Sequence, residues 1–157
     1  MTTAAYPAGM PTFLATKSRN QPASFGMAQP RRGYGYAQKI GTDTPVFWDV
    51  QFRFNRNDAV RFQLWFLTVI NKGADEFTIP IRTEFGSVTH VARFLPDGLL
   101  NTTPDGFDVV TYSATIMARA QVVPDAYTDA ADMILALPDW MAWAGLLDES
   151  IAALPEA

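Results

Sequence analysis

The chain has 157 residues, of which 48% are hydrophobic and 18% charged, and its formal net charge is -4 at pH 7. This length and apolar content suit one globular domain and exclude a wholly disordered chain. With no cysteine and a single histidine, His90, the sequence excludes disulfides, thiolate metal sites, cysteine nucleophiles and sites that need two imidazoles.

Residues 1–43 contain scattered prolines and show neither the alternation of a strand nor the period of a helix. We interpret them as an extended N-terminal arm with isolated apolar and aromatic anchors: Phe13, Leu14, Phe25, Tyr34 and Tyr36. These anchors are too sparse for a core, so we expect a neighbouring subunit to cover them and a chain without residues 1–40 to fold. A long loop that packs on its own domain is the alternative.

Residues 44–123 form the predicted core domain, which starts with a strand and a helix. Apolar and polar residues alternate over residues 46–54, as in a strand with one buried face. Residues 55–58 supply capping side chains, and a helix is predicted over residues 59–70. Gly73 suits the left-handed position that ends it.

Three further strands are predicted at residues 77–82, 88–95 and 110–119, with an exposed loop at residues 101–106. Pro80 assigns the first of them to a sheet edge or a bulge. We expect the following side chains to be buried together: Trp48, Val50, Phe52, Phe62, Phe66, Phe77, Ile79, Phe94, Tyr112, Ala114 and Ile116.

Residues 124–157 form the third predicted segment, which is acidic and helical. One helix begins at Pro124 and is stopped by Pro138, and Asp139 then caps a second helix. Its apolar side carries Trp140, Trp143, Leu146, Leu147 and Ile151. The whole order predicts an α+β fold with a mainly antiparallel, β-sandwich-like sheet, packed with one helix after the first strand.

Charge is distributed unevenly along the chain. Residues 1–42 carry five cations and no acid, whereas residues 124–157 carry seven acids and no Lys or Arg. Opposite charges at the two ends predict contacts between copies or with neighbouring proteins. The candidate contact residues are Arg31, Arg32, Tyr34, Tyr36, Lys39, Asp125, Asp129 and Asp132. Two simply solvated ends are the alternative.

No motif of enzyme chemistry stands out. His90 lies within a predicted strand without a spaced nucleophile or acid, which favours a histidine that packs or hydrogen-bonds locally. Phosphate-binding and nucleophile-elbow glycine motifs are missing from the sequence. We therefore predict a protein without enzymatic activity, catalytic residues, cofactor or metal. The cations and tyrosines of residues 31–36 resemble single-strand binders, but one short basic run is a weak signal for nucleic acid.

The apolar runs are too short for a secretion signal or a membrane helix. We expect a protein made in the cytoplasm that leaves, if at all, within a larger particle, without membrane insertion.

Residues 47–119 resemble small tail structural proteins of tailed bacteriophages. The resemblance consists of a strand with Trp48, a helix with Trp65-Phe66, residues 73–77 running into Pro80, then Gly86, His90 and Arg93-Phe94, and a last strand at residues 112–119. It implies a virion component of the tail or of the head-to-tail connection, which forms a ring or stacked oligomer through arm exchange. Its partners would be copies of itself and neighbouring tail proteins, with DNA only as passing cargo. A carbohydrate- or peptide-binding module that uses Tyr127, Trp140 and Trp143 is the alternative.

Overall fold

The computed structural model describes residues 3–14, 16–42, 44–96, 101–104, 108–143 and 145. The chain divides into two compact units, Met1–Val122 and Val123–Ala157. Its class is α+β, with a mostly antiparallel sheet and few helices, which confirms the predicted class. In the described part of the chain, no helix has the length and apolar character needed to cross a membrane.

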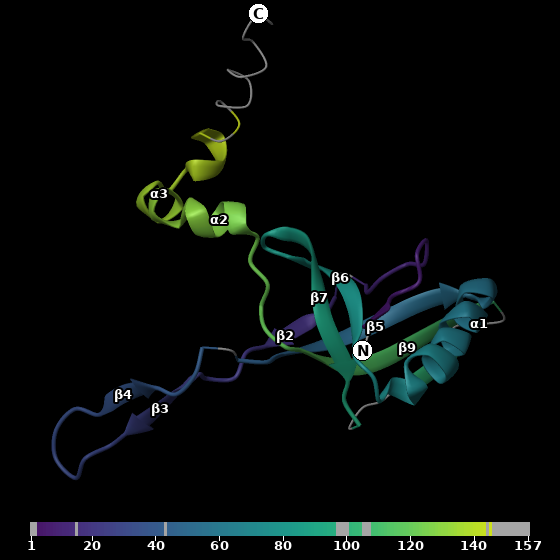
Figure 1. Ribbon diagram of the computed structural model, residues 1–157, viewed down its shortest axis with the longest axis horizontal. Helices are drawn as coiled ribbons and strands as arrows, with labels where there is room; N and C mark the ends of the chain where they lie inside the picture. The colour runs from purple at the N-terminus through teal and green to yellow at the C-terminus, as the bar shows by residue number, and fades with distance from the viewer. Residues whose placement is uncertain are drawn as a thin grey trace, which may run out of the picture. The chain divides into compact units, whose positions relative to one another are not determined.

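The first unit is built on a seven-stranded sheet with the order β1-β6-β7-β9-β5-β2, and β8 pairs with β9 beside this path (Figure 1). All of its pairs are antiparallel except β1 with β6. The strands are β1 (Ala4–Ala5), β2 (Ser18–Asn20), β5 (Val46–Asn55), β6 (Phe77–Thr83), β7 (Gly86–Phe94), β8 (Asn101–Pro104) and β9 (Val109–Ala118).

Strand alternation decides which face of this sheet is buried. β5 and β9 pair along their whole length, from Val46 opposite Ala118 to Asn55 opposite Val109. Every second residue of each strand points into the core, so cross-strand neighbours share one apolar face. Pro80 has no strand beside it on the outer edge of β6, because β1 pairs only with Phe77 and Thr78. The predicted edge position thus holds at Pro80 itself but not for the whole strand, because β1 lies beside Phe77 and Thr78 of β6.

The predicted loop at residues 101–106 is wrong for Asn101–Pro104, which form β8. β7 pairs with only Ala118, Met117 and Ile116 of β9, so the rest of that edge needs another partner. β8 supplies it by pairing with residues 110–113 of β9. Asp105 and Gly106 lie outside the described residues.

The predicted helix at residues 59–70 is present with a different start and a change of type. α1 (Arg56–Leu64) begins after Asn55, whose side chain accepts a hydrogen bond of 2.9 Å from the Asp58 amide. A π-helical turn, η1 (Trp65–Val69), and a 3-10 turn, η2 (Asn71–Gly73), follow it. Gly73 closes the segment at φ 91°, as predicted, a backbone conformation that glycine adopts without strain.

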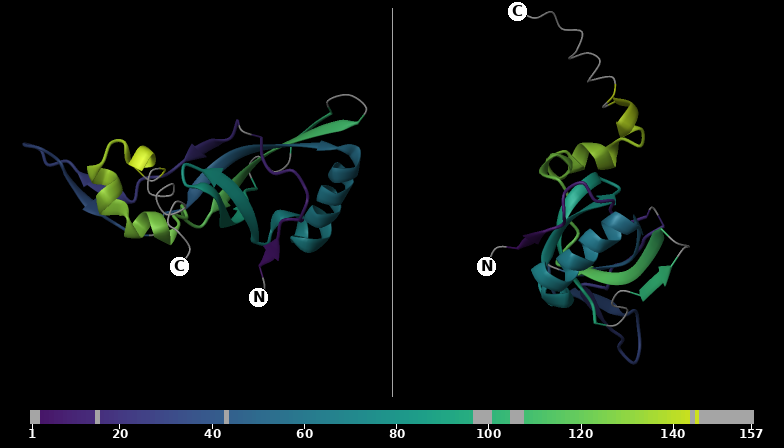
Figure 2. Two further views of the ribbon diagram at one scale, coloured as in Figure 1. Left: turned by 90° about the horizontal axis from the view of Figure 1, so that it is seen from above. Right: turned by 90° about the vertical axis from the view of Figure 1, so that its right-hand side faces the viewer.

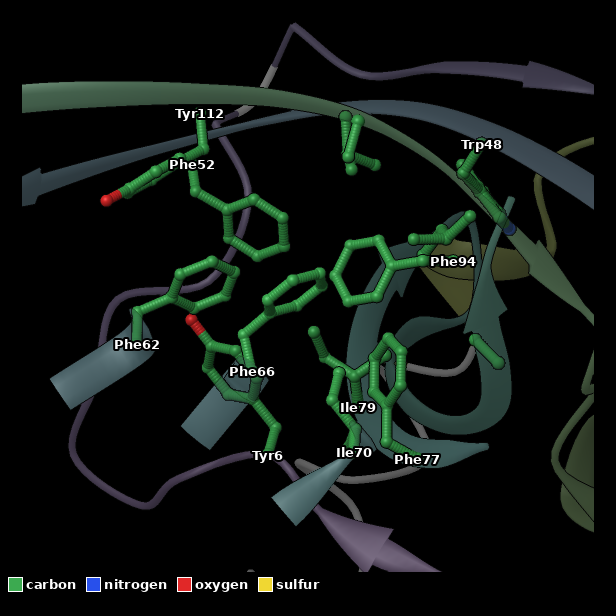
Figure 3. Packing of buried hydrophobic residues seen from close by; sticks show 14 of the residues in the cluster. Tyr6, Trp48, Phe52, Phe62, Phe66, Ile70, Phe77, Ile79, Phe94 and Tyr112 are labelled. Carbon is green, nitrogen blue, oxygen red and sulfur yellow. The ribbon is translucent and has the colours of Figure 1, made fainter. Parts of the chain in front are cut away.

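Aromatic rings from the helix and from both halves of the sheet meet in one core (Figure 3). The Phe62 ring lies 5.1 Å from Phe52 of β5 and 5.2 Å from Tyr112 of β9. The centre of the Trp65 ring lies 5.2 Å from that of Phe77, and the centre of the Phe66 ring lies 5.5 Å from that of Phe94. The sheet thus bends around the helix (Figure 2), and every side chain predicted to be buried together lies in this core.

Residues 3–14 belong to the same core, so the prediction that a neighbouring subunit covers the arm is wrong for them and the alternative, packing on their own domain, holds. Tyr6 and Met10 are buried, and the Tyr6 ring lies 5.5 Å from Trp65. The Tyr6 hydroxyl donates to the Pro11 carbonyl at 2.7 Å, and burial raises its pKa above the ordinary value. Phe13 packs at 4.8 Å on Phe52. These anchors are sparse in sequence, but each fills a gap that the sheet and the helix leave open.

The second unit contains two short helices where one was predicted: α2 (Asp125–Asp129) and α3 (Ala131–Ala136). The chain leaves helical geometry at Ala130, with ψ 8°, and again at Leu137 before Pro138. A further turn begins after Asp139, whose carbonyl accepts from the Ala142 amide at 3.0 Å. Leu146, Leu147 and Ile151 of the predicted second helix lie outside the described residues.

Candidate assembly surfaces

A separate β-hairpin, here called the finger (residues 24–41), is inserted in the sequence between two strands of the main sheet, β2 and β5. β3 (Phe25–Ala28) pairs with β4 (Tyr36–Lys39), and the Ile40 amide closes its base on the Ser24 carbonyl at 2.9 Å. β2 and β5, which precede and follow the finger, pair with each other. The finger is therefore an insertion held at both ends by the sheet, and Figure 1 shows it beyond the start of β5.

β2 is held firmly beside the finger. The Arg19 guanidinium forms two hydrogen bonds to the Glu84 carboxylate, at 2.7 and 2.9 Å, and lies 5.4 Å from the centre of the Trp48 ring. This contact lowers the pKa of Glu84 below its ordinary value. A paired, charge-assisted contact of this kind fixes the direction in which the chain leaves the sheet.

The finger exposes apolar side chains on both faces. Phe25 and Met27 share one face, because cross-strand partners and second neighbours lie on the same side, and Tyr36 lies on the other. All three are exposed, as is Ile40. An isolated two-stranded hairpin is at best marginally stable in water, and here neither face has cover from a second layer of the described chain. Exposed apolar side chains of this kind are typical of protein–protein contact sites.

The end of the finger is cationic and aromatic. Arg31 and Arg32 lie in the turn, where Gly33 adopts φ 101°, and Tyr34 is 97% exposed. Within the residues that the structure describes, neither arginine forms an ion pair, and the same holds for Lys39. Residues 24–41 contain no acid, so these charges are not neutralised locally.

A second uncovered surface lies on the helix, opposite its buried face. Val60, Leu64 and Leu67 follow one another at spacings of four and three, which places them on one side. All three are about half exposed or more, and Leu64 is 58% exposed. The sequence predicts a helix here but not which of its residues remain in solvent, because almost every position from 62 to 70 is apolar.

The second unit carries exposed acidic groups and an aromatic groove on the same two helices. Asp125, Asp129 and Asp132 are all exposed on α2 and α3, and no residue of these two helices is buried. A cavity of about 260 Å³ opens between the helices and the turn after Asp139, lined by Tyr127, Met133, Ile134, Leu137, Trp140 and Trp143 among others. Its walls are mainly apolar. We call this cavity the aromatic groove.

The predicted contact residues fall into two groups. Arg31, Arg32, Tyr34, Tyr36 and Lys39 are brought together on the finger. Asp125, Asp129 and Asp132 lie together on the second unit, so each charge cluster belongs to a different unit. Sequence reasoning missed the apolar members of these surfaces, Met27, Ile40, Leu64 and Met133, because a single apolar residue carries no sign of whether it will be covered.

His90 has a structural role in the first unit, as predicted. It is 1% exposed, its Nδ1 donates to the Val88 carbonyl at 2.9 Å, and its Nε2 accepts from the Val122 amide at 3.2 Å. Both ring nitrogens are thereby occupied, and burial lowers the pKa of the imidazole. Among the described residues, no group of three or more His, Asp or Glu side chains is placed to hold a metal ion.

The pKa of Glu76 is also strongly shifted, and the role of this residue is structural as well. It accepts from Arg93 of β7 at 3.0 Å and from Arg119, which follows β9. These two guanidinium groups lower the pKa of Glu76 to about 2. The carboxylate thus joins the start of β6 to two neighbouring strands.

In comparisons with known proteins, no family model matches this sequence and no curated protein matches it significantly.

Proposed function

We propose that this protein is a non-enzymatic structural component of a tailed bacteriophage virion, in the tail or the head-to-tail connection. One observation carries the proposal: the finger is held at both ends by the sheet, yet it exposes apolar side chains on both of its faces. A monomer gains nothing from ordering such an element, whereas a subunit of an assembly covers it with a neighbour.

The proposed assembly is a ring or a stack of copies in which the finger replaces the whole arm as the exchanged element. Subunits in a ring meet through different surfaces, and the cationic finger and acidic second unit are two surfaces of that kind. The resemblance of residues 47–119 to phage tail proteins supports the same assignment. We further propose that the bent sheet resembles a β-sandwich and that the C-terminal segment is helical in type.

In this proposal the protein is made in the host cytoplasm and ends in the virion, with neighbouring tail proteins as further partners. Any central channel would pass DNA as cargo, so its wall should be acidic or neutral. A wall dense with Lys and Arg would bind phosphates and retain the DNA.

The test is electron microscopy of the purified full-length chain and of virions from the phage that encodes it. We expect rings or stacks from the pure protein at high concentration, and immunogold labelling of the tail or neck of the particle. A chain that stays monomeric and is missing from particles would contradict the proposal.

The aromatic groove supports a second candidate, a carbohydrate- or peptide-binding module. Trp140 and Trp143 line the groove, and Tyr127 packs edge-on at 5.9 Å against Trp140. Aromatic walls of this type stack on sugar rings or on apolar peptide side chains. Saturable quenching of tryptophan fluorescence by an oligosaccharide or a peptide, lost in Trp143→Ala, would favour this function over assembly.

A further inference from the structure

We infer that the end of the finger of one copy docks into the aromatic groove of the second unit of the next copy. This inference rests on the proposed function, because it names the two surfaces through which neighbouring subunits would meet. The occupant of the groove is therefore a second copy of this chain.

Charge complementarity is the first argument. The finger carries Arg31, Arg32 and Lys39 and no acid, and residues 124–157 carry seven acids and no Lys or Arg. The groove lies on α2 and α3, which expose Asp125, Asp129 and Asp132. Opposite clusters accelerate encounter and fix the orientation, and they also disfavour contact of a finger with a finger or a groove with a groove. The pairing therefore favours a head-to-tail contact, which is the contact that builds rings and stacks.

Apolar complementarity is the second argument. Tyr34 is the most exposed large aromatic side chain of the described residues and stands at the turn of the finger, between Gly33 and Gly35. The groove offers Trp, Tyr and Met side chains around a cavity of about 260 Å³. Tyrosine flanked by arginine is the residue pattern that dominates protein interfaces, with the ring in a desolvated pocket and the charges at its rim.

The lack of apolar packing on both partners is the third argument. α2 and α3 bury none of their residues, and short helices without a packed face are marginal in water. The finger is a hairpin without a second layer. Docking gives each element the apolar cover that it lacks in the isolated chain.

The test uses two full-length variants that each reverse one surface. R31E/R32E makes the finger acidic, and D129R/D132R replaces two exposed acids of α2 and α3, the helices that form the groove, by cations. Alone, each variant places like charges in the proposed contact, so we expect its self-association to weaken about tenfold or more. Mixed in equal amounts, the two variants offer one wild-type contact and one reversed but complementary contact. Assembly should then return as mixed species in light scattering and native mass spectrometry.

Three controls make the result interpretable. R82E reverses an exposed cation on β6, outside the finger, the groove and the exposed side of α1, and should leave assembly unchanged. R31K/R32K keeps the charge and should retain most of the association. Y34S removes the apolar anchor while keeping both arginines, and should weaken association at all salt concentrations. Circular dichroism and thermal melting confirm that each variant is folded.

Each outcome decides a separate point. Rescue by mixing supports the docking of one copy on the next. Loss in both variants without rescue shows that finger and groove meet within one chain, or that the groove takes another occupant, and overturns the inference. Rings that form normally from R31E/R32E overturn the inference but leave the proposed function standing. A wild-type chain that never assembles contradicts the proposed function itself.

Discussion

Individual side chains in this protein divide into those that hold the fold and those that the fold presents to solvent. His90, Glu76 and Arg19 have the chemistry of site residues, yet each is engaged in a structural contact. Arg31, Arg32 and Tyr34 belong to one short run of cations and tyrosines in the sequence, and the fold leaves them exposed at the end of the finger. Placement therefore decides the role of each residue more than its chemical type does.

Trp48 allows a direct test of the core. Its side chain is buried on β5, and its Nε1 has no hydrogen-bond partner among the described residues. We expect Trp48→Ala to lower the free energy of unfolding by about 3 to 5 kcal/mol, as truncation of large buried aromatics does. Trp48→Phe should cost clearly less, because it also removes a buried donor that lost its hydration on folding. Urea unfolding followed by circular dichroism measures both, and equal losses in the two variants would refute this explanation.

His90 predicts a pH dependence with a defined sign. Its folded-state pKa is lowered by burial, whereas in the unfolded chain it titrates near about 6.5. Below that pH the unfolded state binds a proton that the folded state does not. The contribution of His90 to the free energy of unfolding is therefore complete above that pH, and it falls as the pH drops toward the folded-state pKa. The limiting slope for one proton is about 1.4 kcal/mol per pH unit.

Urea unfolding of the wild type and of His90→Gln at pH values between about 8 and 5 isolates this contribution. The variant should be less stable at the upper end, where it loses the contacts to Val88 and Val122. The difference between the two proteins should shrink as the pH falls. A constant difference would mean that folding does not change the pKa of His90.

At the scale of elements, residues 1–43 act as two different structures. Residues 3–20 complete the core and both edges of the sheet, through Tyr6, Met10, β1 and β2. Residues 24–41 form the finger, which pairs only with itself in the described chain. The helix also changes its type within its length, from α-helix to a π-helical turn. In that turn two consecutive residues, Trp65 and Phe66, are both buried.

Two deletions separate the roles of these segments. Replacing residues 25–40 by a short Asn-Gly turn should leave the melting temperature nearly unchanged and abolish assembly.

Removing residues 1–20 should instead lower the free energy of unfolding by more than about 3 kcal/mol, since two large core side chains are lost. This outcome differs from the sequence-based expectation that a chain without residues 1–40 would fold. Thermal melts and size-exclusion chromatography report both effects, and a stable chain without residues 1–20 would restore that expectation.

At the scale of the whole molecule, polarity is the main property. The segment that carries cations and no acid lies toward one end of the sequence, and the segment that carries acids and no Lys or Arg lies toward the other. The two segments belong to separate units. In the proposed assembly, this distribution would orient neighbouring copies head to tail. Function on this view resides in surfaces that are incomplete until a neighbour is present.

Salt should therefore control assembly without controlling the fold. Raising the ionic strength from about 0.1 M to about 1 M shortens the Debye length from about 10 Å to about 3 Å. We expect the dissociation constant of the oligomer to increase over this range, because the charges at the interface are partly exposed. The melting temperature of the monomer should change little, since its core is apolar. Sedimentation velocity measures the first quantity, and assembly that strengthens with salt would point to a mainly apolar interface.

The sequence by itself determined β5, β6, β7 and β9, the helix between β5 and β6, and the central core, because each of these is predicted by a local period of apolar residues. It also determined the polarity of charge, which needs no structure to count. Only the tertiary structure decided that residues 3–14 complete the core, that residues 101–104 pair with β9, and that residues 24–41 stand apart as a finger. Those segments have no period of their own. Their conformation is set by sheet edges and core gaps that distant residues create, so it follows from long-range contacts that a local pattern cannot encode.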